Sequence, residues 1–193
     1  MYKELLSAFA IVLTFAGFFP YIRLILKDEI KPHVFSWVIW SSTTFIVFLA
    51  QLKDGGGAGA WPIGVSALIT GYVAGLAYMK KADISITRTD RFFFLSAMLS
   101  LPLWYLTADP LSAVVILTVV DVFGFAPTLR KAYAHPFDED RVFFMLFMVR
   151  NLVVILALEH YSLTTVLFPA VIAAVCLLLL VMISRRRRLL LSR

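Results

Sequence analysis

Long apolar runs alternate with short polar segments along the whole chain. Each run is close to the roughly 20 residues that a helix needs to cross the hydrocarbon core of a bilayer. The runs lie near residues 5–26, 34–52, 60–79, 92–108, 110–129, 142–158 and 162–184. Helices satisfy their own backbone hydrogen bonds where water is absent, and continuously apolar runs differ from the alternating pattern of barrel strands. The pattern predicts an all-α membrane protein with seven transmembrane helices.

The motif Gly-Phe-x-Pro-x-x-Arg occurs twice, each time near the end of an apolar run. The first copy occupies residues 17–23 and the second occupies residues 124–130, a displacement of 107 positions. In the same register, with no gap, Pro62 aligns with Pro169. Repetition at a fixed offset indicates two copies of one structural unit.

The fourth apolar run has no counterpart in this register, and its presence has a geometric reason. A unit of three spanning helices ends on the side opposite its start, so one extra crossing lets a second copy insert the same way up. We therefore predict a 3+1+3 plan with parallel repeats. Its parts are a first three-helix repeat at 1–81, a linker helix within 82–109, a second three-helix repeat at 110–184 and a basic tail at 185–193.

The distribution of charge supports a membrane protein and gives it an orientation. The 193 residues are 61% hydrophobic and 16% charged, with a net charge of +6. Seven spans place most Lys and Arg residues on one side, which the positive-inside rule makes cytoplasmic. We therefore expect the N-terminus outside and the C-terminus in the cytoplasm, in the plasma (inner) membrane. The basic run Arg185–Arg188 is typical of an anchor to anionic headgroups, and we expect no nucleic-acid partner.

No arrangement of residues indicates catalysis, a metal site or a bound cofactor. Cys176 is the single cysteine and lies inside the last apolar run, so neither a disulfide nor a cysteine metal cluster follows. The three histidines are scattered over connections on both sides. Residues 55–59 are Gly-rich but lack the Lys and Ser/Thr of a phosphate-binding loop, and we expect them to form a flexible outer loop. An enzyme is therefore the least favoured class.

A stripe of two aromatic residues and one polar residue occurs in both units. Spacing of i, i+3 and i+7 puts its three members on one helix face. The stripe consists of Trp37, Trp40 and Thr44 in the first unit and of Phe144, Phe147 and Asn151 in the second. Aromatic residues at this spacing are usually core, but the polar third member favours the wall of a pocket. Thr70 lies near the middle of its own predicted span and is a further candidate for that wall.

Two charged residues, Asp121 and Arg150, fall near the middle of predicted spans, where a charge facing lipid costs about 2.5–3.5 kcal/mol. In the repeat register they align with Thr14 and Thr43, so one unit has Thr with Thr where the other has Asp with Arg. A paired exchange of this kind is expected if the two positions touch. We predict an interior ion pair between Asp121 and Arg150, with Asn151 beside it. The pair could act as a gate or proton-responsive latch, or it could simply hold two helices together.

The predicted plan resembles the SWEET, SemiSWEET and PQ-loop superfamily. In that plan two three-helix units are joined by one linker helix, and each unit has a proline before the cytoplasmic end of its first helix. The stripe is also similar to the Trp-x-x-Trp-x-x-x-Asn element of PnuC-type vitamin transporters, which share that fold. The resemblance implies a small-solute transporter that works by alternating access between two three-helix bundles. It implies that the stripe, Thr70 and Asp121 line a mid-membrane site, and that Pro20 and Pro127 act as hinges. The solute would be a sugar, a vitamin or nucleoside, or an amino-acid-like molecule, carried by uniport or with protons through Asp121.

Two other classes stay open at this point. The same fold could serve as a membrane receptor or sorting protein that binds a ligand without transporting it, and Arg150 would suit a carboxylate ligand. It could also serve as an interaction subunit with no solute path. The expected partners are the lipid bilayer and a small-molecule solute. Two fused units can enclose a path within a monomer, and a homo-oligomer is equally compatible with the sequence.

Overall fold

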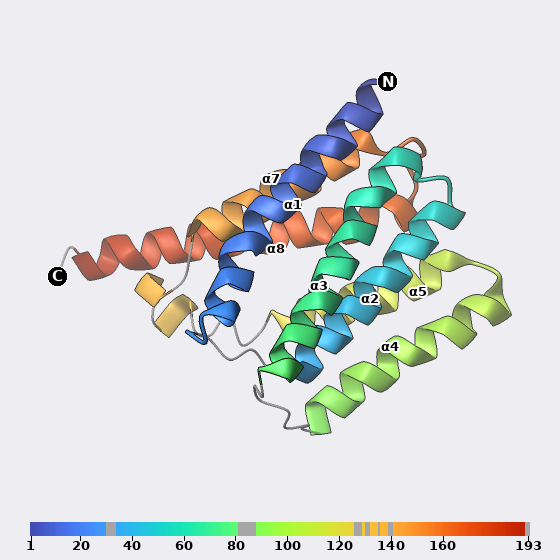
Figure 1. Ribbon diagram of the computed structural model, residues 1–193. Coiled ribbons are helices and arrows are strands. Elements are labelled where there is room, and N and C mark those ends of the chain that lie inside the picture. Colours follow the sequence, from blue (N-terminus) through green and yellow to red (C-terminus); the bar gives the residue numbers. More distant parts are fainter. Residues whose placement is uncertain are drawn as a thin grey trace.

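The computed structural model describes residues 1–29, 34–80, 88–125, 129, 132–134, 136–138 and 141–191. These residues form helices and contain no strand (Figure 1). The α-helices are α1 (Tyr2–Leu26), α2 (Val34–Lys53), α3 (Trp61–Met79), α4 (Arg88–Thr107), α5 (Pro110–Gly124), α7 (Arg141–Ala157) and α8 (Leu163–Leu191). Two short 3-10 helices, η1 (Gly57–Ala60) and η2 (Pro136–Asp138), lie in the connections.

Several of the helices have the length and surface of membrane spans. Four segments are long and apolar enough to cross a bilayer: Tyr2–Leu26, Val34–Lys53, Gly57–Met79 and Leu163–Leu191. Arg91–Thr107 and Pro110–Gly124 are shorter apolar helices. Large apolar side chains face outward, as with Leu68 on α3 at 69% exposed and Leu106 on α4 at 79% exposed. An apolar exterior of this extent is that of a protein surrounded by lipid.

The helices pack in a pattern that is the same in both parts of the chain. α3 packs against α1 and α2, and in the same way α8 packs against α5 and α7. The remaining large helix contacts join α1 to α7 and α2 to α5, while α4 lies on α5 and α2. Exchanging α1 with α5, α2 with α7 and α3 with α8 therefore leaves the main contacts among these six helices unchanged, whereas α4 has no counterpart.

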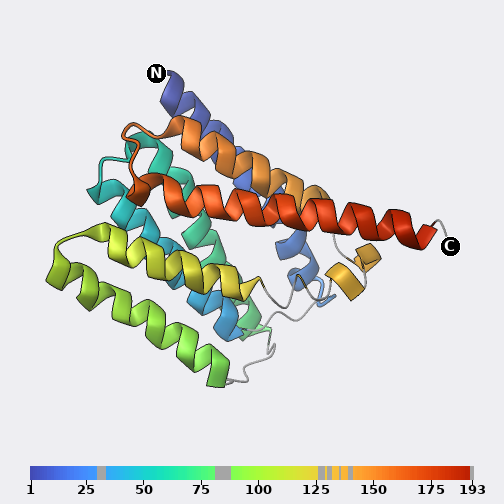
Figure 2. The same ribbon diagram turned by 180° about the vertical axis from the view of Figure 1, so that it is seen from behind.

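The connections divide between the two ends of the bundle. The N-terminus lies at the same end as the α2–α3, α4–α5 and α7–α8 connections, and α8 runs from that end to the C-terminus at the other (Figures 1 and 2). We call the first end the N-terminal end and the second the C-terminal end. The interface of α1 with α7 and of α2 with α5 runs between these ends.

Of the two motif prolines, Pro20 is among the described residues. α1 remains helical through Pro20 and ends at Leu26. α5 ends at Gly124, three residues before Pro127, and Pro127 itself lies outside the described residues. At its start α5 is capped by Asp109, whose carboxylate accepts a hydrogen bond from the Leu111 N–H at 2.9 Å.

The Gly-rich segment 55–59 is packed in place and includes the 3-10 helix η1, unlike the flexible loop expected from its composition. Gly57 has a φ of +56°, a region that favours glycine. A Cβ on Gly59 would lie 2.6 Å from the backbone nitrogen of Leu158, in the α7–α8 connection. The Ala58 N–H donates to the Glu159 carboxylate at 3.0 Å. Glycine is therefore used here for close approach of two connections.

α8 is longer than the other helices, and its last turns are tied to the segment before α7. Its 29 residues extend about 43 Å, against a hydrocarbon core of about 30 Å. The helix continues through Arg185–Arg188 and projects beyond the bundle (Figure 1). The Arg186 guanidinium lies 4.2 Å from the Tyr133 ring centroid, and Arg187 Nε donates to the Pro136 carbonyl at 2.9 Å.

Candidate functional site between α1, α2, α5 and α7

Arg150, on α7, is buried where α7 meets α1 and the start of α3. Only 3% of the residue is exposed. Its Nε donates to Thr14 Oγ1 at 3.1 Å, its Nη1 to Asn151 Oδ1 at 3.0 Å and its Nη2 to the Pro62 carbonyl at 2.6 Å. Thr14 can accept this bond because its own hydroxyl donates to the Ala10 carbonyl of α1 at 2.8 Å. The guanidinium is thus held by three neutral acceptors.

Asp121, on α5, is buried where α5 meets α2. The residue is 6% exposed, and its Oδ1 accepts a hydrogen bond from Thr43 Oγ1 at 2.9 Å. The same hydroxyl lies 3.0 Å from the Trp40 carbonyl, so its single proton can serve either oxygen. A threonine of the first unit therefore donates to the carboxylate, as another accepts from the guanidinium.

The predicted ion pair between Asp121 and Arg150 is not found. Among the described residues, no ion pair involves either side chain. The reason lies in the packing, because α8 lies against both α5 and α7, and each of those helices turns its polar side chain to the other part of the chain. Asn151 is beside Arg150, as expected, and also donates from its Nδ2 to the Phe147 carbonyl at 2.8 Å.

The observed contacts repeat at the offset seen in the sequence. Positions 14 and 121 are equivalent in the register of 107, and so are positions 43 and 150. Thr14 bonds to Arg150, and Asp121 bonds to Thr43. The same two positions therefore meet twice, each time across the interface between the two parts of the chain. Contacts of this reciprocal kind are the mark of a two-fold relation between the surfaces that make them.

One turn further along each helix the reciprocity recurs. A Cβ on Gly17 of α1 would lie 2.5 Å from the Phe147 ring of α7. A Cβ on Gly124 of α5 would lie 2.7 Å from Trp40 Nε1 of α2. Gly17 aligns with Gly124, and Trp40 aligns with Phe147, in the register of 107. Because glycine has no side chain, the glycine of each motif leaves room for an aromatic ring of the other unit to pack against it.

Aromatic rings form a connected cluster on the C-terminal side of the polar residues. Trp37 lies 5.5 Å from Trp40 and 5.0 Å from Tyr21 between ring centroids. Phe18 joins this group to the second unit, since its ring lies 6.3 Å from Trp37 and 5.2 Å from Phe147. The sequence prediction included Trp37, Trp40 and Phe147 but omitted Phe18 and Tyr21. Both omitted residues stand inside the repeated motif, which was the signal available for finding them.

The other candidates lie elsewhere. Thr70 donates to the Ser66 carbonyl one turn back on its own helix, at 2.7 Å. Phe144 is 4% exposed and belongs to the apolar core. Thr44 is also buried, next to Thr43 on α2. The structure thus brings together Trp37, Trp40, Phe147, Asn151 and Arg150 around the α1–α7 and α2–α5 contacts, whereas Thr70 and Phe144 make contacts of their own.

The N-terminal end of the interface has polar contacts between the two connections. The Ser162 hydroxyl donates to the Asp54 carboxylate, and the His160 ring nitrogen lies 2.9 Å from the Asp54 carbonyl. Gln51, which is fully buried at the end of α2, donates to the Thr165 carbonyl of α8 at 2.8 Å. Its side-chain oxygen has no hydrogen-bond partner among the residues that the structure describes. Polar residues therefore join the two parts of the chain at this end, and aromatic residues do so on the other side.

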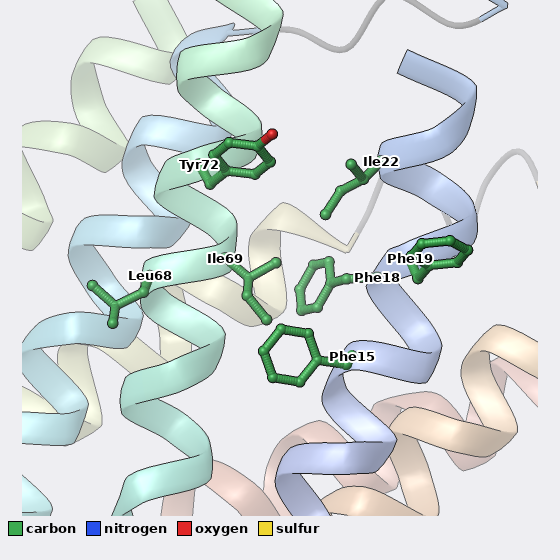
Figure 3. A pocket seen from close by; sticks show the side chains of 7 residues that line it. All are labelled: Phe15, Phe18, Phe19, Ile22, Leu68, Ile69 and Tyr72. Atoms are coloured by element: carbon green, nitrogen blue, oxygen red, sulfur yellow. The ribbon is translucent and has the colours of Figure 1, made fainter. Parts of the chain in front are cut away.

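A cleft of about 420 Å³ opens between α1 and α3 (Figure 3). Its lining residues are Phe15, Phe18, Phe19, Ile22, Leu68, Ile69 and Tyr72. Apart from the Tyr72 hydroxyl, the lining side chains shown are hydrocarbon (Figure 3). None of the residues predicted from sequence lines this cleft, whose lining comes from α1 and α3.

The described residues contain no group of three or more His, Cys, Asp or Glu that could hold a metal ion. Of the histidines, His33 and His135 lie outside the described residues. Comparisons with family models, with curated proteins and with solved structures find no match to this chain. The fold and the site define an all-helical membrane protein with a buried polar layer, which consists of Thr14, Thr43, Asp121, Arg150 and Asn151.

Proposed function

We propose that the protein is a small-solute membrane transporter that works by alternating access between two three-helix bundles. The bundles are α1–α3 and α5 with α7 and α8, joined by α4 in a 3+1+3 plan. The N-terminus would lie outside and the C-terminus in the cytoplasm. The observation that carries the proposal is the reciprocal pair of contacts, Thr14 with Arg150 and Thr43 with Asp121. Two like units facing each other across buried polar groups are the arrangement that a rocking transporter needs.

The buried polar layer is hard to explain as a device for stability alone. Ionisable groups inside a membrane bundle are costly and usually mark a pathway for ions or solutes. Here the guanidinium and the carboxylate each face a neutral threonine of the other unit, and these bonds hold the two units together. Movement of one unit against the other would break the same bonds and present both groups to a solute.

Contacts on the two sides of this layer provide candidate gates. At the N-terminal end, Asp54 meets Ser162. On the C-terminal side, Phe18 meets Phe147, and Trp40 lies over Gly124. In alternating access one set opens while the other stays closed. Pro20, and Pro127 outside the described residues, would supply the bending of the first helix in each unit.

A cross-link tests this movement. In a Cys176→Ser background, Asp54→Cys with Ser162→Cys joins the two units at the N-terminal end. The matched control joins α2 to α3 inside the first unit, by Ser41→Cys with Gly71→Cys. A Cβ at Gly71 would lie 3.8 Å from Ser41 Cβ, the usual separation in a disulfide.

The readout is uptake of radiolabelled sugars, nucleosides, vitamins and amino acids into proteoliposomes, before and after oxidation. Oxidation should abolish uptake in the variant cross-linked between units, reductant should restore it, and the control should keep its uptake. Unchanged uptake after complete cross-linking between the units would refute alternating access at this interface.

A proton-responsive role for Asp121 forms part of the same proposal. Asp121→Asn keeps an oxygen for the Thr43 hydroxyl and removes the ionisable group. If protons drive the flux, this variant should lose uptake driven by a pH gradient and keep exchange of labelled for unlabelled solute. Retention of pH-driven uptake would assign Asp121 a structural role.

A receptor is the second candidate, and one observation favours it. Arg150 is a buried cation whose described partners are all neutral, so a bound anion would complete its surroundings. A receptor would bind such a ligand with no uptake into proteoliposomes. Binding without flux, in liposomes with the protein in both orientations, would replace the transporter by this alternative.

A further inference from the structure

The Arg150 guanidinium has hydrogen-bonding capacity that its neighbours leave unused. An arginine side chain has five N–H donors. Thr14, Asn151 and Pro62 take one each, from Nε, Nη1 and Nη2. Among the described residues no acceptor takes the remaining two N–H groups, one on each terminal nitrogen. Arginine can bind both oxygens of a carboxylate with two of its N–H groups.

The charge of Arg150 is also uncompensated by its immediate surroundings. A buried charge is normally paired, because desolvation makes an isolated one costly. Among the described residues the other buried charged side chain is Asp121, which receives its hydrogen bond from Thr43 and forms no ion pair with Arg150. The equivalent of Arg150 in the first unit is Thr43, which is neutral. The cationic character therefore belongs to one half of the site.

Local contacts hold this cation in one orientation. Asn151 takes one edge of the guanidinium and is itself fixed by its bond to the Phe147 carbonyl. Thr14 is fixed in turn by its bond to the Ala10 carbonyl. Side chains that fix a recognition group before the ligand arrives reduce the entropy lost on binding. Neutral acceptors can do so without neutralising the charge that a ligand would meet.

We propose that Arg150 recognises the carboxylate of the solute, so that the substrate class is a small organic monoanion. Asn151 and Thr14 are positioning residues for this group. The inference rests on the proposed function, since it concerns the same site and the solute that the two bundles would exchange. It selects acids from the wider set of sugars, vitamins, nucleosides and amino acids that the fold alone would accept.

The first test is thermal stability of the purified protein in detergent at constant ionic strength. The probes are sodium acetate, lactate and benzoate, each paired with its neutral amide. A ligand that binds the folded state raises the melting temperature. At least one acid should raise it while its amide does not. Equal effects of acid and amide, or no effect of any acid, would overturn the inference.

Variants then assign the effect to one residue. Arg150→Gln should weaken binding of the acid on the order of 30-fold or more, as expected when one partner of a buried charge pair is lost. Arg150→Lys should retain part of the discrimination between acid and amide. The control Arg141→Gln removes an exposed arginine of the same helix and should change nothing. An acid-induced shift that survives in Arg150→Gln would refute the assignment. If Arg150→Gln does not fold, the comparison of Arg150→Lys with wild type takes its place. The assignment is then refuted if Arg150→Lys distinguishes acid from amide as strongly as wild type does.

Uptake separates this inference from the transporter proposal. Radiolabelled acid that binds through Arg150 but does not enter proteoliposomes would leave the substrate class standing and refute transport. The protein could also take up a neutral solute while acids neither raise its melting temperature nor inhibit that uptake. This result would leave transport standing and refute the substrate class.

Discussion

The two contacts between a motif glycine and an aromatic ring allow a quantitative test of how the two units meet. Gly17→Ala adds a methyl group 2.5 Å from the Phe147 ring, and Gly124→Ala adds one 2.7 Å from Trp40 Nε1. Carbon atoms in contact prefer about 3.5–4.0 Å, so each ring must move by roughly 1 Å. Gly75→Ala is the matched control, because a Cβ on that glycine of α3 meets no atom within 4 Å.

The expected difference follows from two opposing contributions. Replacement of Gly by Ala in an open helix position stabilises by up to about 1 kcal/mol. Overpacking of an interface costs about 1–3 kcal/mol. Gly17→Ala and Gly124→Ala should therefore each be about 1–3 kcal/mol less stable than Gly75→Ala. For a chain of this size that corresponds to a melting temperature lower by about 2–12 °C.

Thermal unfolding in detergent measures these differences, and a second substitution tests their cause. Phe147→Leu shortens the ring that Gly17→Ala would strike, so the double variant should be more stable than additivity predicts by about 0.5 kcal/mol or more. Gly17→Ala that is as stable as Gly75→Ala would refute the close contact of α1 with α7. An additive double variant would show that the methyl group and the ring do not meet.

Three further predictions follow from other contacts. Asp121→Asn should be more stable than Asp121→Leu by about 1–3 kcal/mol, because leucine leaves the buried Thr43 hydroxyl without its partner; thermal unfolding measures this, and equal stabilities would contradict the bond. Gly59→Ala should lower the melting temperature more than Gly17→Ala does, because its methyl group meets backbone that cannot rotate aside; an unchanged melting temperature would contradict the packed connection. In a Cys176→Ser background, an impermeant thiol reagent on intact cells should label Lys53→Cys and leave Ser192→Cys unlabelled; the opposite pattern would invert the proposed orientation.

The existence of the helices could be predicted from the sequence, and most of their bounds to within a few residues, although α5 ends five residues before the run 110–129 does and α8 continues seven residues beyond the run 162–184. The apolar run 34–52 became Val34–Lys53, and the run 142–158 became Arg141–Ala157, so the starts of α2 and α7 differ by the same 107 positions as the motif. Apolar length and a repeat are local properties of the chain, which is why they can be read from it. The exchange of two threonines for Asp and Arg predicted a contact between Asp121 and Arg150, whereas the contacts found join Thr14 to Arg150 and Thr43 to Asp121.

The sequence could not predict that Asp121 and Arg150 each contact a threonine of the other unit instead of one another. Asp121 and Arg150 belong to the same unit of the sequence. In the structure α8 packs against both α5 and α7, and each of the two charged side chains points to a threonine of the first unit. The Gly-rich segment was misinterpreted for a related reason. Glycine serves a flexible loop and a close approach equally well, and its use at Gly59 depends on the backbone of Leu158, which is 99 positions away in the chain.

The tie between the end of α8 and the segment before α7 has a mechanical consequence. Arg186 and Arg187, near the end of α8, contact Tyr133 and Pro136. A tilt of α8 would therefore either carry these two residues with it or break the contacts. In the proposed transporter, this tie would couple movement of α8 to movement of the residues that precede α7.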